Sequence, residues 1–236
     1  MEWWIDLIEG TYTADFPHIS GSSFIYGPIA IYDLTTGGTD PFELCCYTNK
    51  QGKLSLLNRN YRNEESIKEA KSKLKGSNSI VSVSLIGEPK HGSVKNKDAC
   101  MYTLFINKDE KRATVIFRNS DVFKKLPIDV YWLQNCLMPD LGIADYKLDA
   151  CFNRITLRAP FFYIYINAAK KRYIKEKDVV KNILTADNSL VKAFLSWYNK
   201  PIPNYKSLER AGRRMKELEI YKEIEPYIKG DSIESI

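Results

Sequence analysis

Residues 118–129 hold the densest set of chemically capable groups in the chain. The segment begins with Arg118, ends with Asp129, and lies between two apolar stretches. Cys100 precedes it at the start of a strand-like run, and Tyr165 follows it in an aromatic run. A thiolate is a strong nucleophile, and a nearby guanidinium lowers the pKa of a thiol. A cysteine, an arginine, carboxylates and a phenol together predict a site for covalent, nucleophilic chemistry.

The elements around this segment predict a single α+β domain over residues 1–236. Aromatic and β-branched runs between turn residues predict strands over 24–33, 42–47, 79–86, 101–107, 113–117, 145–151, 153–158 and 161–167. The strands 101–107 and 113–117 form a hairpin. A change from glutamate to lysine along 64–75 predicts a helix that stops at Gly76. Pro127 starts a second helix, to about Leu137, and Pro139 ends it. The region of about 168–236 is helical, with a break at 201–203 and a last helix over about 207–224.

Composition limits the class of protein. A length of 236 residues, with 44% hydrophobic and 27% charged residues, is typical of a globular domain. No apolar run approaches the roughly 20 residues of a membrane helix, and the start lacks the basic end of a signal peptide. We therefore expect a soluble, cytoplasmic protein. Five cysteines without a CxxC pair, and only two histidines, support neither a disulfide framework nor a zinc site. The net charge of +6 indicates either an anionic partner or simply a solvated surface.

The order of the motifs resembles the thymidylate synthase superfamily, whose members transfer a one-carbon unit to carbon 5 of a pyrimidine nucleotide. In that family a Pro-Pro-Cys-His loop, a hairpin, Arg-Ser-x-Asp, x-Gly-x-Pro-x-Asn and a His-x-Tyr strand follow one another. The corresponding text here is Asp98-Ala99-Cys100-Met101, the hairpin, Arg118-Asn119-Ser120-Asp121, Lys125-Leu126-Pro127-Ile128-Asp129 and Tyr163-Ile164-Tyr165. The resemblance covers about residues 64–170. It implies a thymidylate-synthase-like mixed sheet packed by helices, a homodimer, a pyrimidine nucleoside monophosphate as substrate and 5,10-methylenetetrahydrofolate as cofactor.

The resemblance also implies roles for individual residues. Cys100 adds to carbon 6 of the base, while Arg118 activates the thiol and holds the phosphate. The implied substrate-binding residues are Arg118, Asn119, Asp121, Asp129, Tyr163 and Tyr165. A gapless alignment of the hairpin puts Asp98 at the nucleophile position, and only a shorter turn restores Cys100. The alternative role for Cys100 is that of a small buried residue.

Two of these positions have alternative explanations. Asp121 either helps to hold the base or caps the helix near Pro127. Thymidylate-making members have asparagine at the position of Asp129, and cytidylate hydroxymethylases have aspartate. A protonated carboxyl, or a carboxylate working through water, matches the exocyclic amine and ring acceptor of cytosine. Asp129 is otherwise a polar residue of the first helical turn, where the helix dipole favours it.

The two tyrosines of the last apolar run are also open to two interpretations. Alternation along a strand over 161–167 places Tyr163 and Tyr165 on one face. They are then either binding groups that face a cavity or aromatic core residues with their hydroxyls at the edge.

Several positions depart from the family pattern. Ser77-Asn78-Ser79 stands where the family has two arginines, Met101 replaces a histidine, and Lys125 replaces a glycine. These changes allow an altered substrate, a phosphate held by other residues such as Lys124 or Lys125, or a loss of catalysis.

Two functional hypotheses follow. The first is a transferase that leans towards cytidylate (dCMP or CMP) hydroxymethylation, with Cys100, Arg118 and Asp129 as catalytic residues. The second is a catalytically lapsed relative that binds nucleotide as a sensor or structural subunit. The basic segments 168–173 and 210–216 could contact phosphates, but neither contains a recognised nucleic-acid-binding motif. We therefore do not expect a nucleic acid partner.

Overall fold

The computed structural model describes residues 2–13, 18–20, 23–37, 40–45, 47, 49–86, 100–158, 161–184 and 190–191. Its helices are α1 (Glu2–Thr13), α2 (Pro41–Leu44), α3 (Lys50–Tyr61), α4 (Glu64–Lys75), α5 (Leu126–Trp132), the π-helical turn η2 (Leu133–Leu137), α6 (Met138–Leu141), α7 (Phe162–Arg172) and α8 (Lys177–Ile183). Its strands are β1 (His18–Ser20), β2 (Ser23–Tyr26), β3 (Ile29–Leu34), β4 (Ile80–Ser84), β5 (Met101–Asn107), β6 (Arg112–Phe117), β7 (Ser120–Asp121), β8 (Lys147–Phe152) and β9 (Ile155–Arg158).

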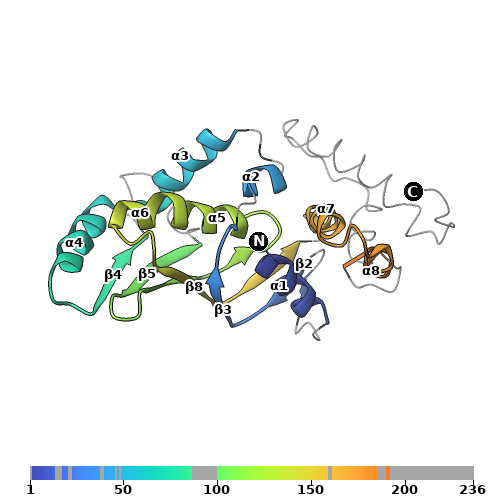
Figure 1. The fold of residues 1–236 in the computed structure, drawn as a ribbon, viewed down its shortest axis with the longest axis horizontal. Coiled ribbons are helices and arrows are strands. Elements are labelled where there is room, and N and C mark those ends of the chain that lie inside the picture. Colours follow the sequence, from blue (N-terminus) through green and yellow to red (C-terminus); the bar gives the residue numbers. More distant parts are fainter. Residues whose placement is uncertain are drawn as a thin grey trace.

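The strands form two sheets, and helices pack on them. One sheet has the order β1-β2-β9-β7 and the other β3-β8-β6-β5-β4. The pairs β6/β8 and β7/β9 are parallel, and the remaining pairs are antiparallel. Figure 1 shows α4, α5 and α6 along one side of the five-stranded sheet, with α3 beyond α5. The prediction of an α+β fold with a mixed sheet is confirmed.

The chain passes between the two sheets at three neighbouring places. The chain passes from β2 to β3, from β6 to β7 and from β8 to β9 through two residues each. The neighbours stay the same on both sides, since β9 lies between β2 and β7 just as β8 lies between β3 and β6. The two sheets are therefore halves of one bent sheet. At the bend, Gly27 has a φ of +151°, and a Cβ there would lie 2.5 Å from the carbonyl oxygen of Asn153.

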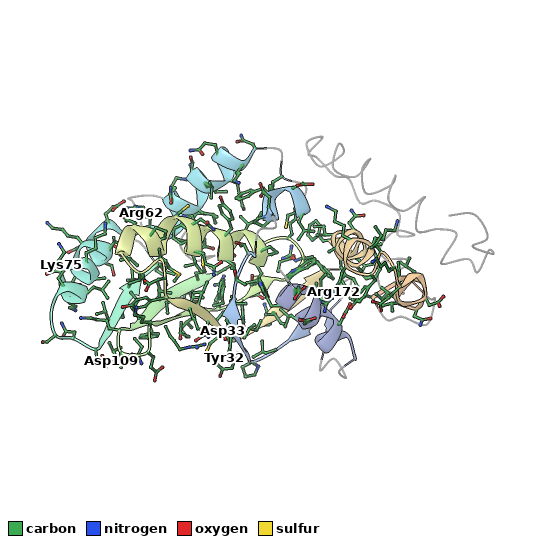
Figure 2. All side chains as sticks on the ribbon, viewed as in Figure 1. Tyr32, Asp33, Arg62, Lys75, Asp109 and Arg172 are labelled. Carbon is green, nitrogen blue, oxygen red and sulfur yellow. The ribbon has the colours of Figure 1, made fainter. Side chains whose placement is uncertain are left out.

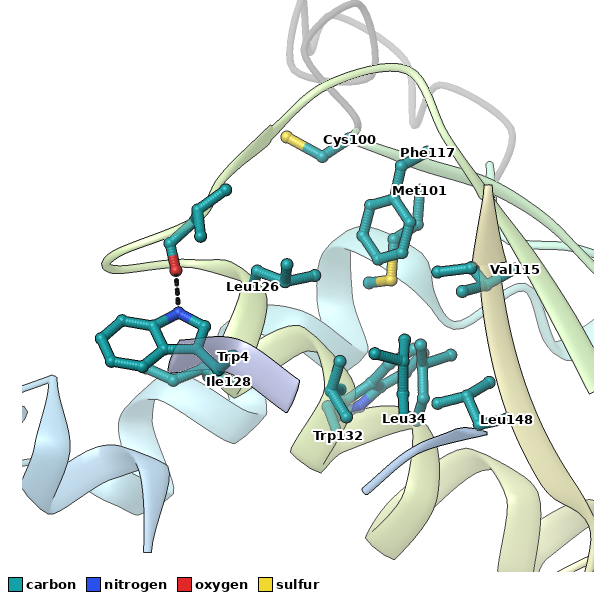
Figure 3. Packing of buried hydrophobic residues seen from close by; sticks show 14 of the residues in the cluster. Trp4, Leu34, Cys100, Met101, Val115, Phe117, Leu126, Ile128, Trp132 and Leu148 are labelled. Atoms are coloured by element: carbon teal, nitrogen blue, oxygen red, sulfur yellow. Dashed lines mark hydrogen bonds between the residues drawn. The ribbon is translucent and has the colours of Figure 1, made fainter. Parts of the chain in front are cut away.

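The hydrophobic core fills the space between the five-stranded sheet and α5. Figure 3 shows Leu126, Ile128 and Trp132 on the helix side and Leu34, Val115 and Leu148 on the sheet side. The indole of Trp4 in α1 donates a hydrogen bond of 2.5 Å to the carbonyl oxygen of Val122. This bond ties α1 to the turn that leads into α5.

The opposite face of the five-stranded sheet is covered by no described helix (Figure 1). Tyr32, Ile80 and Phe105 are 67%, 67% and 44% exposed, and Figure 2 shows Tyr32 and Asp33 on this side of the sheet. Arg112 makes a bidentate contact of 2.8 and 2.6 Å with Asp149 on the same face. This side of the sheet therefore mixes exposed apolar groups with a charge pair.

Several predicted elements are confirmed and three are wrong. The helix 64–75, the hairpin and the strands near 79–86, 145–151 and 153–158 are present. The predicted strand 42–47 is instead the short helix α2, because Asp40 accepts a hydrogen bond from the amide of Phe42 and Pro41 suits a first turn. The predicted strand 161–167 lies in α7. Pro139 does not end the second helix, which continues through α6 to the left-handed Gly142.

Other parts of the chain were either not predicted or lie outside the described residues. The sequence analysis assigned no element to α1 or α3, and the predicted strand 24–33 is divided between β2 and β3. The predicted break at 201–203 and the predicted helix over 207–224 lie outside the described residues. None of the described helices is both long and apolar enough to cross a lipid bilayer.

Because of the bend, we predict that a side chain at position 27 destabilises the protein. In Gly27→Ala the new methyl group meets the backbone of Asn153 at 2.5 Å and of Arg154 at 2.9 Å, and the φ of +151° strains any side chain. We expect a loss of about 2 kcal/mol or more in the free energy of unfolding, measured by urea denaturation. Gly10→Ala is the matched control, because it lies in α1 with no atom within 4 Å of the added methyl group. Equal stability of the two variants would contradict the bend.

Candidate functional site

Cys100 and Arg118 meet where the hairpin ends. Met101 pairs with Phe117, so the residues just outside the pair are neighbours. The amide of Arg118 donates a hydrogen bond of 2.8 Å to the carbonyl oxygen of Cys100. Cys100 is 9% exposed. The structure therefore brings together two of the predicted catalytic residues, whereas Asp98 lies outside the described residues.

Tyr61, at the end of α3, contacts this junction. The amide of Cys100 donates a hydrogen bond of 3.2 Å to the Tyr61 hydroxyl oxygen. The Tyr61 ring lies 6.0 Å from the ring of Trp132, centroid to centroid. Burial raises the pKa of Tyr61, and the negative charge of Asp129 and the thiol of Cys100 raise it further. The phenol therefore stays protonated and can donate a hydrogen bond.

Asp129 is a buried carboxyl in the first turn of α5. It is 4% exposed, and its amide donates a hydrogen bond of 2.9 Å to the carbonyl oxygen of Lys125. The described residues act on the carboxylate through burial and through the charges of Lys53, Lys125 and Asp121. Burial raises the pKa of Asp129 to about 7, against the lowering effect of Lys53 and Lys125. The group therefore exchanges a proton near neutral pH.

Lys53 approaches the same cluster from α3. Its Nζ lies 5.3 Å from the centroid of the Tyr47 ring. Burial lowers the pKa of Lys53, while the negative charge of Asp129 and the thiols of Cys45 and Cys100 oppose that shift. The sequence analysis identified neither Lys53 nor Tyr61. Their separation by about two helical turns, which places both on one face of a helix, could have predicted that they lie together.

Asp121 has a structural role in the described residues. It is 5% exposed, its Oδ2 lies 3.3 Å from Nε of Arg158, and its Oδ1 accepts a hydrogen bond of 3.1 Å from the amide of Lys124. Burial raises the pKa of Asp121, opposed first by the charge of Arg158. The side chain closes the turn ahead of α5, whereas the residue at the N-cap itself, Lys125, forms no side-chain cap. Asp121 therefore caps the turn that precedes α5, and it does not cap the N-terminus of α5 itself.

The strand beside β7 is β9, and not the segment that holds Tyr163 and Tyr165. Asp121 pairs with Thr156 in the register of these strands. Thr156 Oγ1 donates a hydrogen bond of 3.0 Å to Oδ1 of Asn119. Thr156 and Arg158 therefore occupy the place beside the site that the sequence analysis assigned to the two tyrosines.

The two tyrosines belong to α7, which corrects their predicted arrangement. The strand alternation that put Tyr163 and Tyr165 on one face is therefore wrong, and the side chain of Tyr163 lies outside the described residues. Tyr165 is 1% exposed, and its hydroxyl donates a hydrogen bond of 3.1 Å to Oε1 of Glu9 in α1. The core interpretation fits Tyr165, which joins α7 to α1.

The cluster formed by Lys53, Tyr61, Cys100 and Asp129 combines a nucleophile, a proton donor and acceptor with a pKa near 7, a phenol and an ammonium group. Such a set can add a thiolate to an electron-poor ring and move a proton to or from it. No group of three or more histidine, cysteine or acidic side chains in the described ranges is placed to hold a metal ion.

The comparisons with known proteins add no family to this picture. No protein-family model matches the chain, and no curated protein matches it significantly.

Proposed function

We propose that the chain is a thymidylate-synthase-like pyrimidine nucleotide C5 methyl or hydroxymethyl transferase, with cytidylate as the favoured substrate. The observation that carries the proposal is the meeting of Cys100, Tyr61 and Asp129 around the end of the hairpin. The motifs that resemble the family are the same ones that contribute Cys100, Arg118 and Asp129 to this place. The proposed one-carbon donor, 5,10-methylenetetrahydrofolate, follows from the resemblance alone.

The chemistry assigns complementary tasks to the thiol and the carboxyl. The Cys100 thiolate forms a bond to carbon 6 of the cytosine ring, while the C5–C6 double bond shifts and negative charge moves to the ring nitrogen N3. Protonated Asp129 gives its proton to N3, so that carbon 5 becomes nucleophilic. After the one-carbon unit is attached, carbon 5 loses its proton, the C6–S bond breaks to release the thiolate, and N3 returns its proton to Asp129, which restores the aromatic ring. A carboxyl with a pKa of about 7 suits this step, since both of its forms are populated.

The preference for cytosine comes from hydrogen-bond complementarity. A neutral carboxyl donates to N3 of cytosine and accepts from its exocyclic amine, whereas uracil presents a donor and a carbonyl. An ionised Asp129 would meet N3 with two acceptors, which leaves a lone pair unsatisfied in a buried place. The neutral form therefore favours cytidylate.

Charge and exposure support the proposed positions of the phosphate and of a second subunit. Arg118 is the proposed phosphate ligand, and the exposed Lys125 beside the cluster is a further candidate. The proposed homodimer has an interface available on the open sheet face, where Tyr32, Ile80 and Phe105 are exposed. A second copy would cover these apolar side chains, which a solvated face leaves in water.

The alternative is a lapsed enzyme that still binds nucleotide. Met101 in place of the family's histidine is fully buried in the core, so it supplies no proton-transfer group. The arginine pair is likewise replaced by Ser77-Asn78-Ser79. Binding depends on fewer of the altered positions than turnover does, which favours a sensor or structural subunit if catalysis is absent.

The exchange of hydrogen at carbon 5 tests the proposed chemistry. We expect release of tritium from carbon 5 of labelled dCMP or CMP, and less from dUMP, because thiolate addition makes carbon 5 exchangeable. Cys100→Ser should reduce release to background, whereas Cys136→Ser, in η2, should retain it. If no nucleotide releases tritium but calorimetry shows that nucleotide binds, the transferase proposal is wrong and the lapsed, nucleotide-binding alternative is favoured.

The pH dependence of binding tests the role of Asp129. The neutral form exists below the pKa of about 7, so the affinity for dCMP should fall by about tenfold per pH unit above that value. Asp129→Asn should flatten the profile and shift preference towards uracil nucleotides, as measured by isothermal titration calorimetry. Asp145→Asn is a control, because Asp145 is paired with Lys111 on the surface. An unchanged base preference in Asp129→Asn would remove the argument for cytosine.

A further inference from the structure

The backbone of Cys100 is held on both of its sides. Its amide donates a hydrogen bond of 3.2 Å to the hydroxyl oxygen of Tyr61 in α3, and its carbonyl oxygen accepts one of 2.8 Å from the amide of Arg118. The next residue, Met101, is buried and pairs with Phe117 in the hairpin. The position of Cys100 at the end of the hairpin therefore depends on a bond from α3 as well as on the strands.

The Tyr61 hydroxyl is itself held in place by packing between α3 and α5. The Tyr61 ring is buried, and its centroid lies 6.0 Å from that of the Trp132 ring. One turn earlier in α3, Asn58 accepts a hydrogen bond of 2.7 Å from the Trp132 indole. Leu57 is buried beside it, so this face of α3 is turned into the protein. The helix thus presents the hydroxyl to Cys100 from a rigid support.

The hydroxyl makes a second contact with the same cysteine. A phenol oxygen that accepts a hydrogen bond from an amide still has its own hydrogen to donate. Tyr61 also forms a side-chain hydrogen bond with Cys100, in which the sulfur is the acceptor. Hydrogen bonds to an ionised acceptor are stronger than those to a neutral one. The contact therefore favours the thiolate over the thiol.

Other charged groups surround this pair, and they act on it differently. Lys53 of α3 interacts with the Cys100 thiol through its charge, and Asp129 of α5 interacts with Tyr61 in the same way. Arg118 contacts Cys100 through its backbone amide. Tyr61, by contrast, forms hydrogen bonds both with the backbone and with the side chain of Cys100.

We propose that Tyr61 is a positioning residue of the candidate site, which holds the Cys100 backbone through its hydroxyl oxygen and donates its hydroxyl hydrogen to the Cys100 thiolate. This inference rests on the proposed transferase, in which the thiolate forms the bond to carbon 6. The phenol keeps its proton throughout. It stabilises the thiolate before the C6–S bond forms and again when that bond breaks.

The first test follows both contacts without nucleotide. Tyr61→Phe removes the hydroxyl and keeps the ring beside Trp132. We expect the Cys100 amide to exchange its hydrogen about tenfold faster in this variant, as measured by NMR, because its acceptor is lost. Alkylation of Cys100 by iodoacetamide, followed by peptide mass spectrometry, should slow about tenfold at pH 7 and reach the wild-type rate near pH 10, where the thiol is ionised in both proteins.

Tyr146→Phe is the matched control, because Tyr146 is a partly buried tyrosine between α6 and β8. It should match the wild type in both measurements. Unchanged amide exchange or unchanged alkylation in Tyr61→Phe overturns the inference, and so does a wild-type Cys100 that does not react. Alkylation slowed by the same factor at every pH also overturns it, because altered access to the sulfur then explains the effect.

Tritium release from carbon 5 of labelled dCMP connects the contact to the proposed reaction. We expect kcat in Tyr61→Phe to fall about tenfold with KM for dCMP near the wild-type value, because Tyr61 acts through Cys100 and not on the nucleotide. A raised KM with an unchanged kcat overturns the positioning role. No release from any protein, with the amide exchange and alkylation as expected, contradicts the proposed function and supports the contact between Tyr61 and the thiolate.

Discussion

The bend of three paired strands fixes the position of Arg118 and Asn119 beside the candidate site. The strands β6 and β8 pair with each other in parallel up to the bend, and their continuations β7 and β9 pair in parallel beyond it. The chain between β6 and β7 contains Arg118 and Asn119, which are therefore held between two ladders of hydrogen bonds. Gly27 permits the close approach of the third strand, because a side chain there would meet the backbone of Asn153. The bend thus gives rigid support to residues that a loop would hold less firmly.

The carboxyl of Asp129 links the fold to the proposed chemistry. A rise in pKa from 3.8 to about 7 corresponds to roughly 4 kcal/mol of preference for the neutral form in the folded protein. Because the folded pKa lies above the unfolded one, ionisation of Asp129 destabilises the fold as the pH rises between these values. A group that lowers stability in this way, beside a thiol and a phenol, is characteristic of a functional site. Tyr61, by contrast, contributes packing against Trp132 as well as its hydroxyl.

The sequence predicted the parts of the site that depend on local structure. Cys100 and Arg118 meet because the hairpin register places them there, and Asp129 follows Pro127 in a first helical turn. Lys53 and Tyr61 were not predicted, because the sequence of α3 is mostly polar and shows no clear apolar face. Which face of α3 is buried becomes clear only from its packing against α5. Tyr163 and Tyr165 were placed on a strand because a wholly apolar aromatic run fits a buried strand and a buried helix equally well.

A crystal structure of the protein with dCMP tests the central claim, that the cluster around the hairpin end binds and activates a pyrimidine. We predict that carbon 6 of the base lies over the Cys100 sulfur and that N3 and the exocyclic amine face the Asp129 carboxyl at hydrogen-bond distance, about 2.7–3.2 Å. A nucleotide bound elsewhere, or bound with the opposite edge of the base towards Asp129, would contradict the account.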